Sequence, residues 1–75
     1  MNQKTYNVKA DECFPEFVLH FIDENELCEV QSEISYNELD ATWILTVTPI
    51  YSDDDFGEFC TELEDLFEEY GFAIV

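Results

Sequence analysis

Acidic side chains are the residues of this sequence with the most evident chemistry, and they cluster near its end. The chain has 19 Asp and Glu residues against two Lys and Arg, and nine of the 19 lie between residues 52 and 71. Carboxylate oxygens bind hard divalent cations. However, the acids at 53–55 are consecutive rather than alternating, and Gly57 is misplaced for a calcium-binding loop. We therefore expect no dedicated metal site and no cofactor.

The other candidate catalytic residues lack partners in the sequence. His20 is the only histidine and lies off the apolar stripe of its segment, as an exposed surface residue would. Ser52 has no base near it in sequence and is better placed to cap a helix. The cysteines Cys13, Cys28 and Cys60 form no CxxC pair, and their odd number argues against a closed set of disulfides. Nothing in the sequence brings a cysteine to His20 as a nucleophilic dyad. We expect that the protein is not an enzyme.

The acidic segment has the pattern of an amphipathic helix. Its apolar residues recur at steps of three and four, at Phe56, Phe59, Cys60, Leu63, Leu66, Phe67 and Tyr70. Ser52 followed by Asp55 has the spacing of a capping box, and Gly71 is placed to end the helix in a left-handed turn. Glu68 and Glu69 lie at the negative helix end, where a sequence selected only for stability would carry cations. This mismatch predicts a partner that supplies positive charge.

The order of the predicted elements indicates the fold class. By range, they are a strand at 4–10, a helix at 15–24, a strand at 26–36, a turn at 37–40, a strand at 41–51, the acidic helix and a strand at 72–75. The apolar run from Phe17 to Ile22 leaves a strand as the alternative to the first helix. The order is that of the ferredoxin-like split βαβ pattern. We expect one α+β domain over residues 1–75, with an antiparallel sheet covered by one long acidic helix and one short helix.

The net charge limits the class of partner. With 47% apolar and 16% aromatic residues, the chain is too hydrophobic for a disordered acidic tail. A formal charge of −17 lowers the stability of the compact state through self-repulsion. Nucleic acids and anionic membranes attract Lys and Arg, so we expect no direct nucleic-acid binding and no membrane association. The N-terminus lacks the apolar run of a signal peptide. We expect a monomer or homodimer in the cytoplasm of a bacterial host cell.

The spacing of the helix acids approximates that of phosphates. Duplex DNA presents about one charge per 3.4 Å along each strand. Eighteen helical residues would rise about 27 Å, so nine carboxylates give about one charge per 3 Å. Acids on one strand and in the turn could add a second track if they converge with the helix. The residues expected to contact a partner are Asp54, Asp55, Glu58, Glu62, Glu64, Asp65, Glu68, Glu69, Glu29, Glu33, Glu38 and Asp40.

In composition and in the helix SDDDFGEFCTELEDLFEEYG, the chain resembles the acidic DNA-mimic inhibitors that phages encode, of the anti-CRISPR and anti-restriction type. The resemblance implies an inhibitor that occupies the basic DNA-binding surface of a host defence complex, by steric and electrostatic competition. The alternative is an immunity protein or antitoxin that blocks a basic nuclease toxin, with exposed Tyr or Trp side chains as anchors. Two further alternatives remain, a chaperone for a basic protein and an acidic surface that serves solubility alone.

Overall fold

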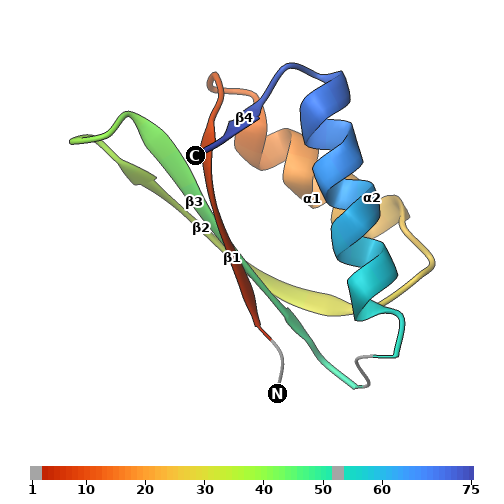
Figure 1. The fold of residues 1–75 in the computed structure, drawn as a ribbon. Helices are drawn as coiled ribbons and strands as arrows, with labels where there is room; N and C mark the ends of the chain where they lie inside the picture. The colour runs from red at the N-terminus through yellow and green to blue at the C-terminus, as the bar shows by residue number, and fades with distance from the viewer. Residues whose placement is uncertain (1–2, 52–53) are drawn as a thin grey trace.

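The strands and helices follow the predicted order. The computed structural model describes residues 3–51 and 54–75. Its elements are β1 (Lys4–Lys9), α1 (Phe14–Glu24), β2 (Val30–Asn37), β3 (Thr42–Pro49), α2 (Phe56–Glu69) and β4 (Ala73–Ile74) (Figure 1). The sheet order is β2-β3-β1-β4, and each neighbouring pair is antiparallel. β3 therefore lies between β1 and β2, which is the split βαβ arrangement. The predicted α+β fold is confirmed.

Both helices pack on the same face of the sheet (Figure 1). In the strands, alternate residues face the helices, so that Tyr6 and Leu45, which are paired across β1 and β3, are both buried. The residues of the predicted α2 stripe that are buried are Phe56, Phe59, Cys60, Leu63 and Phe67. The Phe67 ring lies 5.9 Å from the Tyr6 ring and 5.5 Å from the Phe14 ring of α1. The apolar stripe therefore forms the centre of one shared core.

The two ends of α2 differ in how well the sequence predicted them. The helix begins at Phe56, and Asp55 occupies the N-cap position without a side-chain capping bond. The expected start at Ser52 is therefore too early, and the capping role of Ser52 lies outside the described residues. At the other end, Gly71 has φ of +80°, as predicted. Its N–H donates to Glu68 O, and the N–H of Phe72 donates to Phe67 O. These two bonds form a complete Schellman motif.

The region between α1 and β2 corrects two sequence-based expectations. α1 is a helix through Phe17 and Ile22, so the alternative of a strand there is wrong. β2 begins four residues later than expected. The reason is the side chain of Asn25, whose Oδ1 accepts hydrogen bonds from the N–H groups of Leu27 and Cys28. Such an Asx turn diverts the backbone from sheet pairing.

Candidate interface for a basic partner

Four carboxylates form an exposed row along α2. Because the apolar stripe faces the sheet, Glu58, Glu62, Asp65 and Glu69 all lie on the solvent side of the helix, and each is exposed. Glu68 beside them is also exposed. The five acids span about 16 Å of helix axis, or about one charge per 4 Å. This density is close to the one phosphate per roughly 3.4 Å along a DNA strand. The five residues are called the α2 acidic face below.

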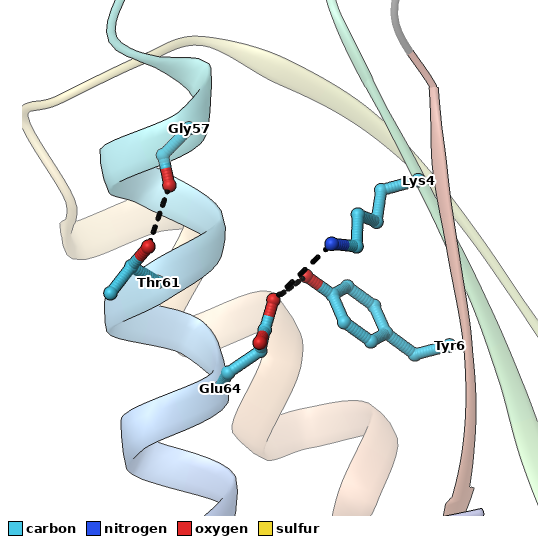
Figure 2. A network of polar contacts seen from close by, with 5 residues as sticks. All are labelled: Lys4, Tyr6, Gly57, Thr61 and Glu64. Atoms are coloured by element: carbon cyan, nitrogen blue, oxygen red, sulfur yellow. Dashed lines mark hydrogen bonds and ion pairs between the residues drawn. The ribbon is translucent and has the colours of Figure 1, made fainter.

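Glu64 lies one turn before Glu68, on the side of α2 that faces β1, and has a structural role. Its Oε2 accepts a hydrogen bond of 2.7 Å from the Tyr6 hydroxyl and lies 3.6 Å from Lys4 Nζ (Figure 2). The Lys4 ammonium also lies 5.6 Å from the centre of the Tyr6 ring. These contacts join α2 to β1. Glu64 was predicted to contact a partner, but the structure places its carboxylate in this internal network.

The lysines of the chain both lie on β1, away from the α2 acidic face. The sequence has two Lys and Arg residues in total. Lys4 pairs with Glu64. Lys9 alternates with the buried Val8, so it points to the sheet face that the helices leave open, where it lines a shallow pocket with Asp40. Neither Lys side chain therefore neutralises the five acids of the α2 acidic face, and these acids repel one another.

A pocket extends the acidic surface beyond the N-terminus of α2. It has a volume of about 390 Å³, and its lining residues are Asn25, Glu26, Leu27, Cys28, Glu29, Tyr51 and Asp55. The fold therefore brings together Glu29 and Asp55, two of the predicted partner-binding residues, from segments 26 positions apart. The sequence reasoning missed Glu26, although its position three residues before Glu29 was a signal. The Tyr51 side chain is 84% exposed at this pocket.

Three predicted residues do not join this surface. Glu33 is paired with Thr46, which in turn is paired with Thr5, and this row lies on the sheet face opposite the helices. Glu38 and Asp40 lie in the β2–β3 hairpin, which projects away from α2 (Figure 1). Asp40 Oδ2 also accepts a hydrogen bond of 3.1 Å from the Asn37 side chain. The second track of charge that the sequence suggested is therefore not formed by these residues.

Tyrosine side chains lie at both ends of the α2 acidic face. Tyr51 belongs to the pocket at the N-terminal end, and Tyr70 follows the C-terminal end directly. Tyr70 is 60% exposed, although the sequence pattern placed it on the buried stripe. Its ring packs on Phe17 at 4.7 Å between centroids, so one side of the ring is supported by α1. An exposed aromatic ring that is supported in this way, as Tyr70 is, is a suitable anchor for a protein partner.

Two of the candidate catalytic residues lie in different surroundings. His20 is exposed on α1, and Cys60 is buried beneath α2. Burial raises the pKa of the Cys60 thiol, which keeps it in the unreactive thiol form. Within residues 3–51 and 54–75, no group of three or more His, Cys, Asp or Glu side chains is arranged to hold a metal ion. The same part of the chain has no helix long and apolar enough to span a membrane.

The chemistry available to this surface is electrostatic. Its groups are carboxylates on a helix that is fixed by its buried stripe, together with exposed tyrosine rings at either end. Such an array binds cationic groups and repels phosphates. No family model, curated protein sequence or solved structure matches the chain.

Proposed function

We propose that the protein is a nucleic-acid-mimicking inhibitor, of the anti-CRISPR or anti-restriction type, that occupies the basic nucleic-acid-binding surface of a host defence complex. The observation that carries the proposal is the α2 acidic face. Its carboxylates are exposed, spaced at about one per 4 Å and fixed on a helix whose other side is core. A groove that binds DNA would meet a comparable density of negative charge.

The energetics of the free protein support this function. Glu68 and Glu69 lie at the negative end of the α2 dipole, and no basic residue lies in the last turn of the helix. A partner with Lys and Arg side chains would remove both this unfavourable interaction and the repulsion among the five acids. Opposite charge also steers the two molecules together and accelerates association.

The test uses two variants with the same net charge. The α2 variant carries Glu58→Lys, Glu62→Lys, Asp65→Lys and Glu69→Lys. The control variant carries Glu16→Lys, Glu33→Lys, Glu38→Lys and Asp40→Lys, all at exposed positions outside the α2 acidic face and its adjoining pocket. Each protein is immobilised and used to capture proteins from bacterial lysate at low salt. We expect the wild type and the control variant to retain the same protein or complex, and the α2 variant to lose it.

The captured protein must also bind DNA, and DNA and the wild-type chain must compete for the same surface of it. We expect that it binds a fluorescent duplex and that the wild-type chain displaces the duplex. The affinity of the wild-type chain for the captured protein, measured directly without DNA, should weaken by at least tenfold between about 50 and 300 mM NaCl, because salt screens exposed charges. Capture that survives in the α2 variant, or a captured protein whose DNA binding is unaffected, would reject the proposal.

A second candidate function is supported by the exposed tyrosines. An immunity protein that blocks a basic nuclease toxin would use aromatic anchors within an acidic surface, and Tyr51 and Tyr70 are placed for this. In that case Tyr51→Ser or Tyr70→Ser should each weaken binding by more than tenfold, and a single acidic substitution such as Glu62→Gln by much less. A small basic nuclease as the captured protein would then favour this function over mimicry.

A further inference from the structure

A groove lined by aromatic rings lies apart from the α2 acidic face. Its volume is about 760 Å³, and its lining residues are Ala10, Asp11, Glu12, Cys13, Tyr36 and Trp43. One wall is the connection between β1 and α1, and the other is formed by Tyr36 of β2 and Trp43 of β3, which are cross-strand partners. The two rings lie 4.8 Å apart in an edge-to-face arrangement. Both rings lie on the helix side of the sheet, and neither ring is completely buried.

The Trp43 side of the groove is held in position by the core. The Trp43 indole N–H donates to the carbonyl oxygens of Ala10 and Asp11, at 3.3 and 3.1 Å. The Phe14 ring, which is fully buried, stacks on the indole at 6.0 Å between centroids. Tyr36 remains 48% exposed, so its π surface is open to a ligand. The Trp43 ring is therefore held by the core, and the Tyr36 ring packs against it.

The rim of the groove is acidic. Asp11 and Glu12 are both exposed, and Asp11 Oδ1 accepts a hydrogen bond from the backbone N–H of Cys13, which orients its carboxylate. The local field is strong enough that the charge of Asp11 raises the pKa of the exposed Cys13 thiol. Aromatic faces beside carboxylates attract cations, because the ring quadrupole and the carboxylate charge act in the same direction.

We propose that this groove binds an arginine side chain of the basic partner, with the guanidinium over Tyr36 and Trp43 and its N–H groups toward Asp11 and Glu12. Arginine suits the groove better than lysine, because a planar guanidinium stacks on aromatic rings and still donates to carboxylates at its edge. A second copy of this chain cannot supply the ligand, because Lys4 and Lys9 are its only Lys and Arg residues and it contains no arginine. That the arginine belongs to a basic partner rests on the proposed function.

The test needs no knowledge of the partner. The probes are acetylated and amidated pentapeptides of glycine with a central arginine, lysine or citrulline, titrated into ¹⁵N-labelled protein. Trp43 is the only tryptophan, so its indole N–H gives one assignable resonance. We expect the arginine peptide to shift this resonance and the backbone amide resonance of Tyr36 saturably. The lysine peptide should bind about threefold more weakly, and the uncharged citrulline peptide at least tenfold more weakly.

Matched variants separate groove binding from general charge attraction. Glu12→Gln and Tyr36→Ser should each weaken binding of the arginine peptide by about two- to fivefold. The dispersion of the amide spectrum checks that each variant is folded. Glu58→Gln makes the same charge change on α2 and should leave the Trp43 response unchanged. Equal binding of arginine and citrulline, equal binding of arginine and lysine, or shifts along α2 without a Trp43 response would each overturn the proposal.

Failure of the groove proposal can be distinguished from failure of the proposed function. The α2 variant should still bind the arginine peptide, because its substitutions lie outside the groove. If the peptide binds but the α2 variant still captures the target, the α2 interface is wrong and the groove stands. If the α2 variant loses the target and no peptide binds at Trp43, the groove is wrong and the α2 interface stands.

Discussion

Glu62 and Glu64 are two positions apart on α2 and have different roles. Two residues correspond to about 200° of helix rotation, so the side chains point to nearly opposite sides. Glu62 is exposed on the α2 acidic face, whereas the Glu64 carboxylate meets Lys4 and the Tyr6 hydroxyl (Figure 2). The ion pair itself contributes little, because both side chains are more than a third exposed. The hydrogen bond from the partly buried Tyr6 hydroxyl is the stronger connection.

This hydrogen bond predicts a pH dependence. Burial, and then the bond to Glu64, raise the pKa of Tyr6 well above its ordinary value of about 10. Above about pH 10, Tyr6 of the unfolded chain loses its hydroxyl proton, whereas Tyr6 of the folded chain retains it. The free energy of unfolding therefore falls as pH rises. Tyr6→Phe should cost about 1 kcal/mol at pH 7 and reduce this alkaline loss, leaving the part due to the raised pKa of the buried Cys60 thiol. Chemical denaturation between pH 7 and 11 checks it, and Tyr51→Phe, at an exposed ring, should match the wild type.

Cys13 gives a second prediction at the scale of one residue. Its thiol is exposed, but the negative charge of Asp11 raises its pKa and so lowers its thiolate fraction near neutral pH. Alkylation of Cys13 by iodoacetamide at pH 7.5 should therefore be slower than that of an unstructured cysteine peptide. Asp11→Asn should accelerate it by about two- to fivefold, as mass spectrometry of the modified peptide would show. An unchanged rate in Asp11→Asn would contradict the electrostatic cause.

At the scale of elements, α2 combines a conventional core face with an unconventional exposed face. The buried stripe and the Schellman motif at Gly71 follow ordinary helix rules. The exposed face does not, since its last turn carries Glu68 and Glu69 against the helix dipole. The helix is therefore well ended by its Schellman motif, whereas the charge of its exposed last turn is not compensated within α2.

Gly57, at the start of α2, and Gly71, just after its end, should respond in opposite ways to substitution by alanine. Gly71 has φ of +80°, and a Cβ there would meet no atom within 4 Å, so Gly71→Ala is costly through the backbone alone, by about 1 kcal/mol. Gly57 lies in the first turn of the helix and also has open space around it. Gly57→Ala should stabilise by about 0.5 kcal/mol, because alanine favours the helix. Thermal denaturation of both variants checks the pair, and equal signs would reject this account of the helix ends.

At the scale of the whole molecule, charge and fold act against each other. The net charge of −17 lowers stability through self-repulsion, and the aromatic core has to offset it. The charge is also distributed unevenly. The sheet face away from the helices carries Lys9 and Glu33 among neutral residues such as Thr5 and Thr46, whose hydroxyls lie 3.2 Å apart. The strongest negative field therefore lies on the helix side.

Added salt should restore part of the stability that is lost through repulsion among the acidic residues. We expect the melting temperature to rise by several degrees between about 20 and 500 mM NaCl, because screening reduces repulsion among exposed acids. The α2 variant has a net charge of −17 + 8 = −9, so its rise should be clearly smaller. Sucrose at equal osmolality serves as the uncharged control. A melting temperature that falls with NaCl, or an equal rise in the α2 variant, would contradict self-repulsion as a destabilising force.

The sequence by itself determined the order of the elements, the buried stripe of α2, the glycine that ends the helix and the acidity of its exposed side. These features depend on local spacing and on residue chemistry, both of which can be read from neighbouring residues. The late starts of α2 and β2 were missed. At β2 the reason is that the side chain of Asn25, rather than the apolar pattern, sets where the strand begins.

Only the tertiary structure decided which acids share a surface. It joined Glu29 to Asp55, turned Glu64 inward to Tyr6, and directed Glu33 to the opposite face of the sheet. It also brought the connection after β1 to Trp43, which created the aromatic groove. Strand pairing and helix packing bring together residues that are far apart in the chain, and no local periodicity contains that information. The acidic character therefore belongs to the sequence, whereas the shape of the surface that presents it belongs to the fold.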